Sequence, residues 1–204
     1  MMQLSPVVDV HQRPLGVLRL SLTARCNLSC PYCCPDSSDR LGLLNLEEQL
    51  RLIRVACRLG AHTLRLTGGE PLLSSQLLPL LQNVFEARRL QGDPMQGLRE
   101  VALTTNGVLL TQQMGRQLKT AGLDRITISL DAVEGAVAAK MTGLQGGSVA
   151  GDRYVQKVLA GVETAKTSGF TPSIGALKLN AVIQRGVNDH QLRPLAHLAR
   201  QHGL

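Results

Sequence analysis

The chain is poor in aromatic residues and has no long hydrophobic run. Aromatic residues make up 2% of its 204 residues, and tryptophan is absent. Proteins that bind single-stranded nucleic acid usually stack bases on several aromatic rings, which this chain cannot supply. No hydrophobic run approaches the roughly 18 residues that span a bilayer, and residues 1–15 lack the charged start and apolar stretch of a signal peptide. We therefore expect a cytoplasmic protein that binds neither membranes nor nucleic acid.

The charge is positive but dispersed. The net charge is +7, yet no run of basic residues stands out. Charge alone would allow duplex binding, but it suits a polyphosphate ligand equally well. A solvated basic surface accounts for most of these side chains. The length and the 44% hydrophobic content suffice for one sizeable domain, which we expect to span residues 1–204.

Short β-rich runs alternate with amphipathic helical stretches. The expected strands are 17–23, 62–67, 100–105, 125–130 and 175–183. The expected helices are 46–59, 75–90, 111–122, about 152–167, and one that runs towards Gly203. Asn45 and Glu48 form the start signal of the first helix. Two stretches rich in turn formers, 91–97 and 142–151, are expected to be surface loops.

This alternation predicts an α/β fold with parallel strands and right-handed crossovers. Either a barrel-like or a doubly wound sheet satisfies it. In both, ligands bind beyond the carboxyl ends of the strands, so the chemistry is expected just after residues 23, 67, 105, 130 and 183. Five strands are too few for an eight-stranded barrel, so we expect a partial (β/α) barrel and a truncated chain.

The stretch "CNLSCPYC" places Cys26, Cys30 and Cys33 directly after the first expected strand. Thiolates favour iron–sulfur clusters, zinc and copper(I). A structural zinc site would need a fourth ligand; Cys34 adjoins Cys33, and adjacent residues rarely converge on one small ion. A [4Fe-4S] cubane held by three thiolates instead leaves one iron open for a small molecule. We expect Cys34 and Cys57 to be structural, with Cys57 in the core.

The cysteine spacing resembles that of the radical S-adenosylmethionine enzymes. The resemblance implies that the reduced cluster cleaves S-adenosylmethionine, and that the resulting radical takes a hydrogen atom from the substrate; no side chain is expected to act as a catalyst itself. Tyr32 would lie against the adenine. In "TGGEP", Gly68, Gly69 and Glu70 would contact the methionine moiety. The alternative readings are loop packing for Tyr32 and a plain tight turn for the glycines.

Five stretches share their order and spacing with one enzyme family: "LRLSLTARCNLSCPYC", "LRLTGGEP", "LTTNG", "AGLDRITISLDA" and "LKLNAVIQRGVND". They resemble the GTP 3′,8-cyclases of molybdenum cofactor biosynthesis. The match runs from about residue 11 to the last residue, with a longer link at 88–98.

The resemblance to this family implies a set of ligand contacts. The positions that match GTP contacts are Arg19, Arg65, Thr104 and Lys178. Those that match contacts to S-adenosylmethionine are Tyr32, Gly69 and Ser129. Three cations on a triphosphate would supply charge-assisted hydrogen bonds. Taken singly, Arg19 or Lys178 could equally face solvent at an edge of the sheet.

Several polar residues at strand ends have two readings. Asn106, Gly107 and Asp131 either line the pocket or form turns. We expect Asp124 and Arg125 to pair with each other at the sheet edge, and "GVND" (186–189) to cap the last helix.

The implied reaction is the lyase-class conversion of GTP to (8S)-3′,8-cyclo-7,8-dihydroguanosine 5′-triphosphate, in which the hydrogen atom comes from the ribose 3′-carbon. The resemblance also implies an electron donor of the flavodoxin or ferredoxin type. A cyclic pyranopterin monophosphate synthase would act downstream as a functional partner. The family resemblance leaves room for a homodimer.

The sequence also departs from the family. Family members continue further and carry three more cysteines for a second [4Fe-4S] cluster, whereas no cysteine follows Cys57 here. We expect a fragment; as a whole polypeptide, it would bind the first cluster poorly and would not cyclise GTP. Two alternatives stay open: another radical enzyme, such as a peptide-modifying one, and a zinc-binding module without catalysis.

Overall fold

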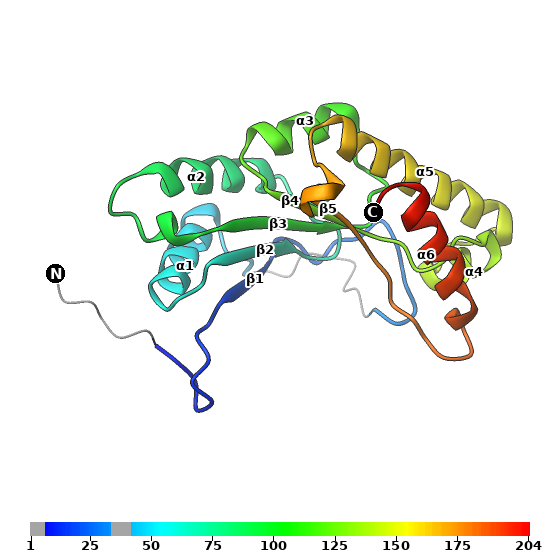
Figure 1. Ribbon diagram of the computed structural model, residues 1–204, viewed down its shortest axis with the longest axis horizontal. Coiled ribbons are helices and arrows are strands. Elements are labelled where there is room, and N and C mark those ends of the chain that lie inside the picture. Colours follow the sequence, from blue (N-terminus) through cyan, green and yellow to red (C-terminus); the bar gives the residue numbers. More distant parts are fainter. Residues whose placement is uncertain (1–6, 34–41) are drawn as a thin grey trace.

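The computed structural model describes residues 7–33 and 42–204. These residues form a parallel sheet with helices along one face (Figure 1). The strands are β1 (Val17–Ser21), β2 (Thr63–Thr67), β3 (Glu100–Thr105), β4 (Arg125–Ser129) and β5 (Leu177–Asn180). The helices are α1 (Leu46–Arg58), α2 (Leu77–Arg89), α3 (Gln112–Thr120), α4 (Gly135–Thr142), α5 (Gly147–Thr167) and α6 (Leu192–Gln201).

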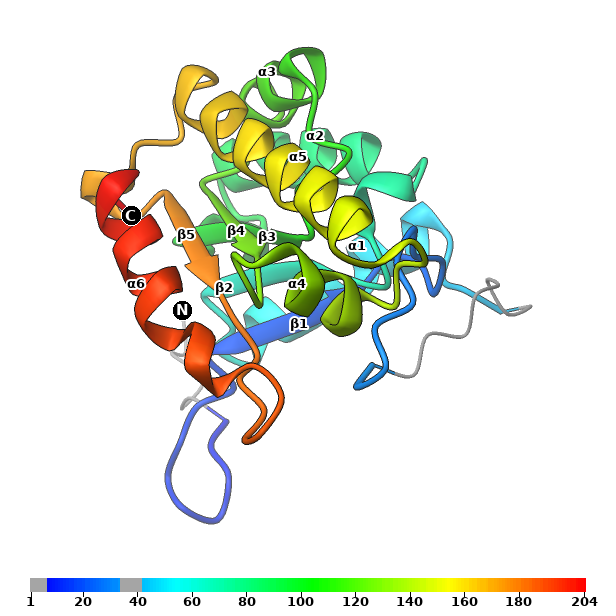
Figure 2. The same ribbon diagram turned by 90° about the vertical axis from the view of Figure 1, so that its right-hand side faces the viewer.

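The strand order follows the chain. The sheet runs β1-β2-β3-β4-β5, and each strand is parallel to its neighbours. A doubly wound sheet reverses its order at a switch point, and the described strands show no such reversal. Of the two predicted architectures, the partial (β/α) barrel is therefore confirmed. The sheet is not closed: β1 and β5 lie at its two edges (Figure 2).

The two faces of the sheet differ in chemistry because side chains alternate along each strand. One face is apolar and belongs to the core; Leu64, Leu66, Leu103, Ile126 and Ile128 are its fully buried strand residues. The helices α2, α3 and α5 lie on this side (Figure 1). The opposite face carries arginine, lysine and threonine side chains. Burial of the first face stabilises the fold and leaves the second free for ligands.

Local capping signals place the helices. Asn45 Oδ1 accepts a hydrogen bond from Glu48 N at 3.0 Å, and Glu48 Oε2 accepts one from Asn45 N at 2.8 Å. The expected capping box of α1 is thus confirmed. Thr111 Oγ1 accepts from Met114 N at 3.2 Å at the start of α3, as its sequence also predicts.

The prediction of a loop over 142–151 is confirmed only for residues 143–146. Helix α4 ends at Thr142, and α5 begins at Gly147. Gly151 lies inside α5 because that helix approaches α4 closely: a Cβ there would lie 2.9 Å from Ala139 N. This glycine serves helix packing rather than a turn. Among the described residues, no helix is both long and apolar enough to cross a bilayer.

Candidate functional site

The cysteine loop follows β1 at the carboxyl edge of the sheet. Cys26, Cys30 and Cys33 are free thiols. They line one cavity of about 160 Å³ together with Ser21, Thr23, Ala24, Leu28, Gly68 and Gly69. Cys34 lies outside the described residues. Cys57 is half-buried on α1 and packs against the core, in line with a structural role.

The thiol environment suits a cluster better than a single ion. Burial raises the pKa of Cys26, and it raises the pKa of Cys30 to about 11. Metal ligation requires the thiolates, so binding would displace their protons.

Within residues 7–33 and 42–204, no three His, Cys, Asp or Glu side chains converge on one metal ion. A cubane supplies a separate iron for each thiolate, so three cysteines around one cavity fit a [4Fe-4S] cluster.

The segment after β2 lies against the chain that enters the cysteine loop. Gly69 N donates to Thr23 O at 2.7 Å, and Glu70 N donates to Arg25 O at 2.8 Å. A Cβ at Gly68 would lie 2.6 Å from Thr23 O, and one at Gly69 would lie 2.6 Å from Ala24 O. Both glycines are therefore required by close backbone approach. They also border the cysteine cavity, where a small ligand would meet their backbone.

Glu70 is fully buried and joins the ends of two strands. Its carboxylate accepts hydrogen bonds from Leu72 N at 3.0 Å, the Thr105 hydroxyl at 2.7 Å and Asn106 N at 2.8 Å. Burial raises its pKa, although these bonds oppose the shift. The side chain is thus engaged by protein donors, and it fixes the end of β3 beside the end of β2.

Tyr32 connects the cysteine loop to the ends of β4 and β5. Its hydroxyl donates to Asp131 Oδ2 at 2.5 Å, and Val182 N donates to Asp131 Oδ1 at 2.8 Å. The Asn188 amide donates to Asp131 O and to Val182 O, both at 2.8 Å. Asn188 is buried and makes no capping hydrogen bond. The prediction that "GVND" caps the last helix was therefore wrong.

Asn106 and Gly107 have structural roles at the end of β3. The Asn106 amide donates to Asn27 Oδ1 at 2.8 Å, which ties β3 to the cysteine loop. Gly107 has a φ of +77°, in the left-handed region that glycine adopts most readily. Of the two readings of Asn106, Gly107 and Asp131, the structure supports hydrogen bonding and turn formation.

The predicted GTP contacts gather on the polar face. Arg19, Arg65, Thr104 and Lys178 line one cavity of about 430 Å³. The other residues around it are Thr67, Arg125, Thr127, Leu179 and Asn180. Arg19 and Lys178 are exposed on the edge strands, as the alternative reading expected, yet both still border this cavity.

Strand register arranges this face in rows. Arg19, Arg65 and Arg125 share one level across β1 to β4, which we call the guanidinium row. Two residues further along the strands lie Thr67, Thr104 and Thr127, which we call the hydroxyl row; Lys178 is the register partner of Thr127. Ser129 pairs with Asn180 two residues beyond that, towards the cysteine loop.

Several cations of this cavity make no direct contact with a carboxylate or another acceptor of the described residues. Across the described residues, the side chains of Arg19, Arg65 and Lys178 make neither an ion pair nor a hydrogen bond. Arg65 Nε is buried and has no acceptor. A buried donor without a partner carries a desolvation cost that an anionic ligand would offset.

Arg125 differs from these cations because it has a carboxylate partner. Its Nε and Nη2 donate to Glu100 at 2.7 and 2.8 Å. Asp124 instead accepts from Arg88 Nη1 at 2.9 Å and from Val101 N at 2.7 Å. The predicted pair between Asp124 and Arg125 was therefore wrong. Arg125 and Thr127 were not assigned to the site from the sequence, although alternation along "RITIS" places both on the face that carries Ser129.

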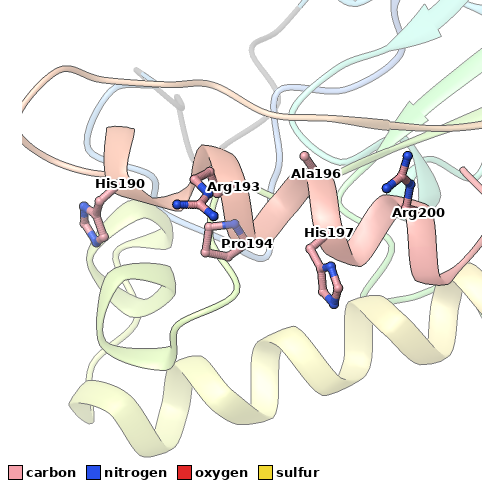
Figure 3. Close-up of a pocket in the computed structure, with 6 residues that line it drawn as sticks. All are labelled: His190, Arg193, Pro194, Ala196, His197 and Arg200. Atoms are coloured by element: carbon pink, nitrogen blue, oxygen red, sulfur yellow. The ribbon is translucent and has the colours of Figure 1, made fainter.

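A hollow of about 870 Å³ lies elsewhere, along α6 (Figure 3). Its lining residues are His190, Arg193, Pro194, Ala196, His197 and Arg200. All are exposed and come from one short segment. Binding sites usually converge polar groups from several elements, so the candidate site is the pair of cavities at the cysteine loop and on the polar face.

Comparison with known proteins decides the family. The sequence model of the radical SAM superfamily matches residues 20–199. The chain belongs to the radical SAM superfamily. This radical SAM assignment agrees with the partial barrel and disfavours the zinc-binding module considered above.

Curated relatives share most of the chain. A protein of Synechococcus sp. (strain CC9605) named GTP 3′,8-cyclase is 67% identical over 199 residues, which are 98% of this chain and 57% of the relative. Another of that name, from Parasynechococcus marenigrum (strain WH8102), is 64% identical over 98% of this chain and 58% of its own length. The chain thus spans little more than half the length of these relatives.

Solved radical SAM structures share the fold. SuiB of Streptococcus suis, bound to S-adenosylmethionine, superposes with a TM-score of 0.67 and 19% identity, covering 94% of this chain and 39% of its own. The methyltransferase TsrM of Kitasatospora setae, with cobalamin and a [4Fe-4S] cluster, gives a TM-score of 0.61 and 16% identity, covering 92% of this chain and 32% of its own. At such identities the likeness concerns the fold alone.

Proposed function

We propose that residues 1–204 are the radical SAM core domain of a GTP 3′,8-cyclase, a lyase of molybdenum cofactor biosynthesis. One observation carries the proposal: a cavity with unpartnered cations adjoins the sheet end that bears three free cysteines. The names of the relatives and the superfamily assignment support it.

The cofactor end of the site is built by the loops after β1 and β2. Cys26, Cys30 and Cys33 would hold a [4Fe-4S] cluster whose fourth iron is open. When bound, the cluster and S-adenosylmethionine supply the radical chemistry that removes a hydrogen atom from the substrate. Tyr32, Gly68, Gly69, Glu70 and Ser129 would surround S-adenosylmethionine; for Glu70 the contact would come from the backbone, because its carboxylate is engaged.

The substrate end of the site lies on the polar face. Arg19, Arg65 and Lys178 would bind the triphosphate of GTP through charge-assisted hydrogen bonds, and Thr104 would add a hydroxyl contact. With the phosphates near the guanidinium row, the ribose would point along the strands towards the cysteine loop. This orientation would bring the ribose 3′-carbon to the cofactor end.

The proposal extends to what acts with this domain. A second [4Fe-4S] cluster would be held by residues outside this chain. An electron donor of the flavodoxin or ferredoxin type would reduce the first cluster, in the cytoplasm. A cyclic pyranopterin monophosphate synthase would consume the product, and a homodimer is the proposed assembly.

The test uses anaerobically reconstituted protein of natural length with GTP, S-adenosylmethionine and dithionite. The expected result is a product of the mass of GTP, chromatographically distinct from it, together with 5′-deoxyadenosine. Cys33→Ala should lose the brown cluster and the product, whereas the matched Cys57→Ala should keep both. Reconstituted wild-type protein that contains cluster but makes no cyclised nucleotide would refute the proposal. A peptide-modifying activity has no comparable support, because the likeness to peptide-bound SuiB concerns the fold alone.

A further inference from the structure

A chain of hydrogen bonds joins Glu100 on β3 to Arg125 and Thr127 on β4, which both line the cavity of the predicted GTP contacts. Glu100 accepts from Arg125 Nε at 2.7 Å and from Nη2 at 2.8 Å. The remaining guanidinium nitrogen, Nη1, donates to Thr127 Oγ1 at 2.8 Å. Arg125 is nearly buried, with 10% of its side chain exposed. The bidentate pair therefore fixes the direction from which Arg125 approaches Thr127.

This chain determines what Thr127 can do. A guanidinium group has only donors, so the Thr127 oxygen must act as the acceptor in their contact. Its own hydrogen is then left for another acceptor. Among the described residues, no hydrogen bond donated by the Thr127 hydroxyl is found. The side chain is half-buried and borders the cavity. Its hydroxyl is therefore available to donate a hydrogen bond to a ligand in that cavity.

The surroundings of Thr127 define the kind of acceptor. Its register partner on β5 is Lys178, whose ammonium group only donates and makes no hydrogen bond or ion pair, and its register partner on β3 is Thr104, whose hydroxyl can donate as well as accept. An oxygen that only accepts can take a hydrogen bond from each of these three groups. Phosphate oxygens have this property, whereas a ribose hydroxyl both donates and accepts.

We propose that Thr127 is a further substrate-binding residue, whose hydroxyl donates to a phosphate oxygen of the nucleotide. The inference deepens the proposed function and rests on it. Thr127 and Lys178 are register partners, so both would contact the triphosphate at the same level of the sheet. Thr127 would contribute a directed hydrogen bond, whereas Lys178 would contribute a positive charge. The Glu100–Arg125 pair makes the contact directional by holding the oxygen lone pair of Thr127.

The experiment measures equilibrium binding of GTP and of inorganic tripolyphosphate by calorimetry, with reconstituted protein of natural length. Thr127→Val keeps the shape of the side chain and removes the donor, together with the acceptor of Arg125 Nη1. It should weaken both ligands about ten-fold, the loss expected for a hydrogen bond to a charged group. Thr127→Ser should restore binding to within about two- to three-fold of wild type, since it restores the hydroxyl. The matched control is Thr63→Val on β2, outside the cavity, which should bind as wild type.

Each outcome separates this inference from the proposed function. If wild-type protein binds GTP and Thr127→Val binds both ligands equally well, the inference is overturned and the proposed function stands. A loss for GTP but not for tripolyphosphate would move the contact to the ribose and also overturn the phosphate assignment. Failure of wild-type protein to bind GTP would refute the proposed function itself. If Thr127→Ser binds as weakly as Thr127→Val, the effect is one of packing and the inference fails.

Discussion

The Tyr32 hydroxyl and the Asp131 carboxylate lie 2.5 Å apart, although 99 positions separate them in the chain. One residue belongs to the cysteine loop and the other to the end of β4. Asp131 also accepts from Val182 N, beyond β5. Through this single carboxylate, the loop after the first strand is held against the two strands at the opposite side of the sheet.

The first prediction concerns Asp131→Ala. The substitution leaves the Tyr32 hydroxyl and Val182 N without their acceptor, so the free energy of unfolding should fall by about 1–3 kcal/mol. Urea unfolding followed by circular dichroism measures it. Asp189, exposed in the 3-10 turn just before α6, supplies the control: Asp189→Ala should unfold as wild type. Equal stability of the two variants would show that the link carries no energy.

Gly69→Ala tests the close approach of two backbones. The new Cβ would collide with Ala24 O, so the segment entering the cysteine loop must shift. We expect a loss of about 1–3 kcal/mol in stability, as for other overpacked sites, and fewer iron and sulfide atoms per chain after reconstitution. Gly97→Ala is the matched control, because a Cβ there meets nothing within 4 Å. Full cluster content in Gly69→Ala would contradict the steric argument.

Arg65 should contribute strongly to GTP affinity. Its buried Nε has no acceptor in the protein, so Arg65→Ala should weaken GTP binding by roughly ten- to a hundred-fold, the range for a hydrogen bond to a charged group. The GTP affinity of Arg65→Lys should lie between those of wild type and Arg65→Ala, because an ammonium group keeps the charge but loses the two-pronged geometry of the guanidinium. Calorimetric titration checks both. Arg58→Ala, at an exposed position of α1, should leave the affinity unchanged; wild-type affinity in Arg65→Ala would remove the cavity as the phosphate site.

The Glu100–Arg125 pair should make the free energy of unfolding depend on pH in the acidic range. Hydrogen bonds from Arg125, with its positive charge, hold the pKa of Glu100 below its ordinary value of 4.5. A carboxyl whose pKa is lowered in the folded state contributes its full stability above 4.5, and this contribution is lost as the pH falls through the folded value. Urea unfolding above and below pH 4.5 should therefore show that the free energy of unfolding falls less at acidic pH in Glu100→Gln than in wild type. Glu86→Gln, exposed on α2, should follow wild type; if Glu100→Gln does so too, the pair does not control acid stability.

The sequence predicts the elements whose signals are local. The capping residues Asn45 and Thr111 lie next to the helices that they start, so α1 and α3 begin where expected. Helix α4 was missed because "GAVAAKMT" is neither strongly amphipathic nor capped by a side chain. It is helical because it packs along α5, which no local pattern reveals (Figure 2).

Pairing across the sheet was harder to predict. Asp124 and Arg125 are neighbours in sequence, but consecutive residues of an extended chain point to opposite sides. Arg125 therefore meets Glu100 on the neighbouring strand, while Asp124 meets Arg88 on the helical side. Asn188 likewise finds a partner far along the chain, because its amide donates to Asp131 O, 57 positions away. The four predicted GTP positions shared a cavity because alternation and parallel register together place them on one face.

The strands of the polar face also work as a ruler. Arg125 and Ser129 lie on the same side of β4, four residues apart, which corresponds to about 13 Å along an extended strand. If the terminal phosphates of a nucleotide are bound at the guanidinium row, its sugar lies at a fixed distance along the strands, towards the cysteine loop. Removing phosphates would shorten that reach, so guanosine mono- and diphosphate would leave their sugar short of the reacting end even while their remaining charge is held.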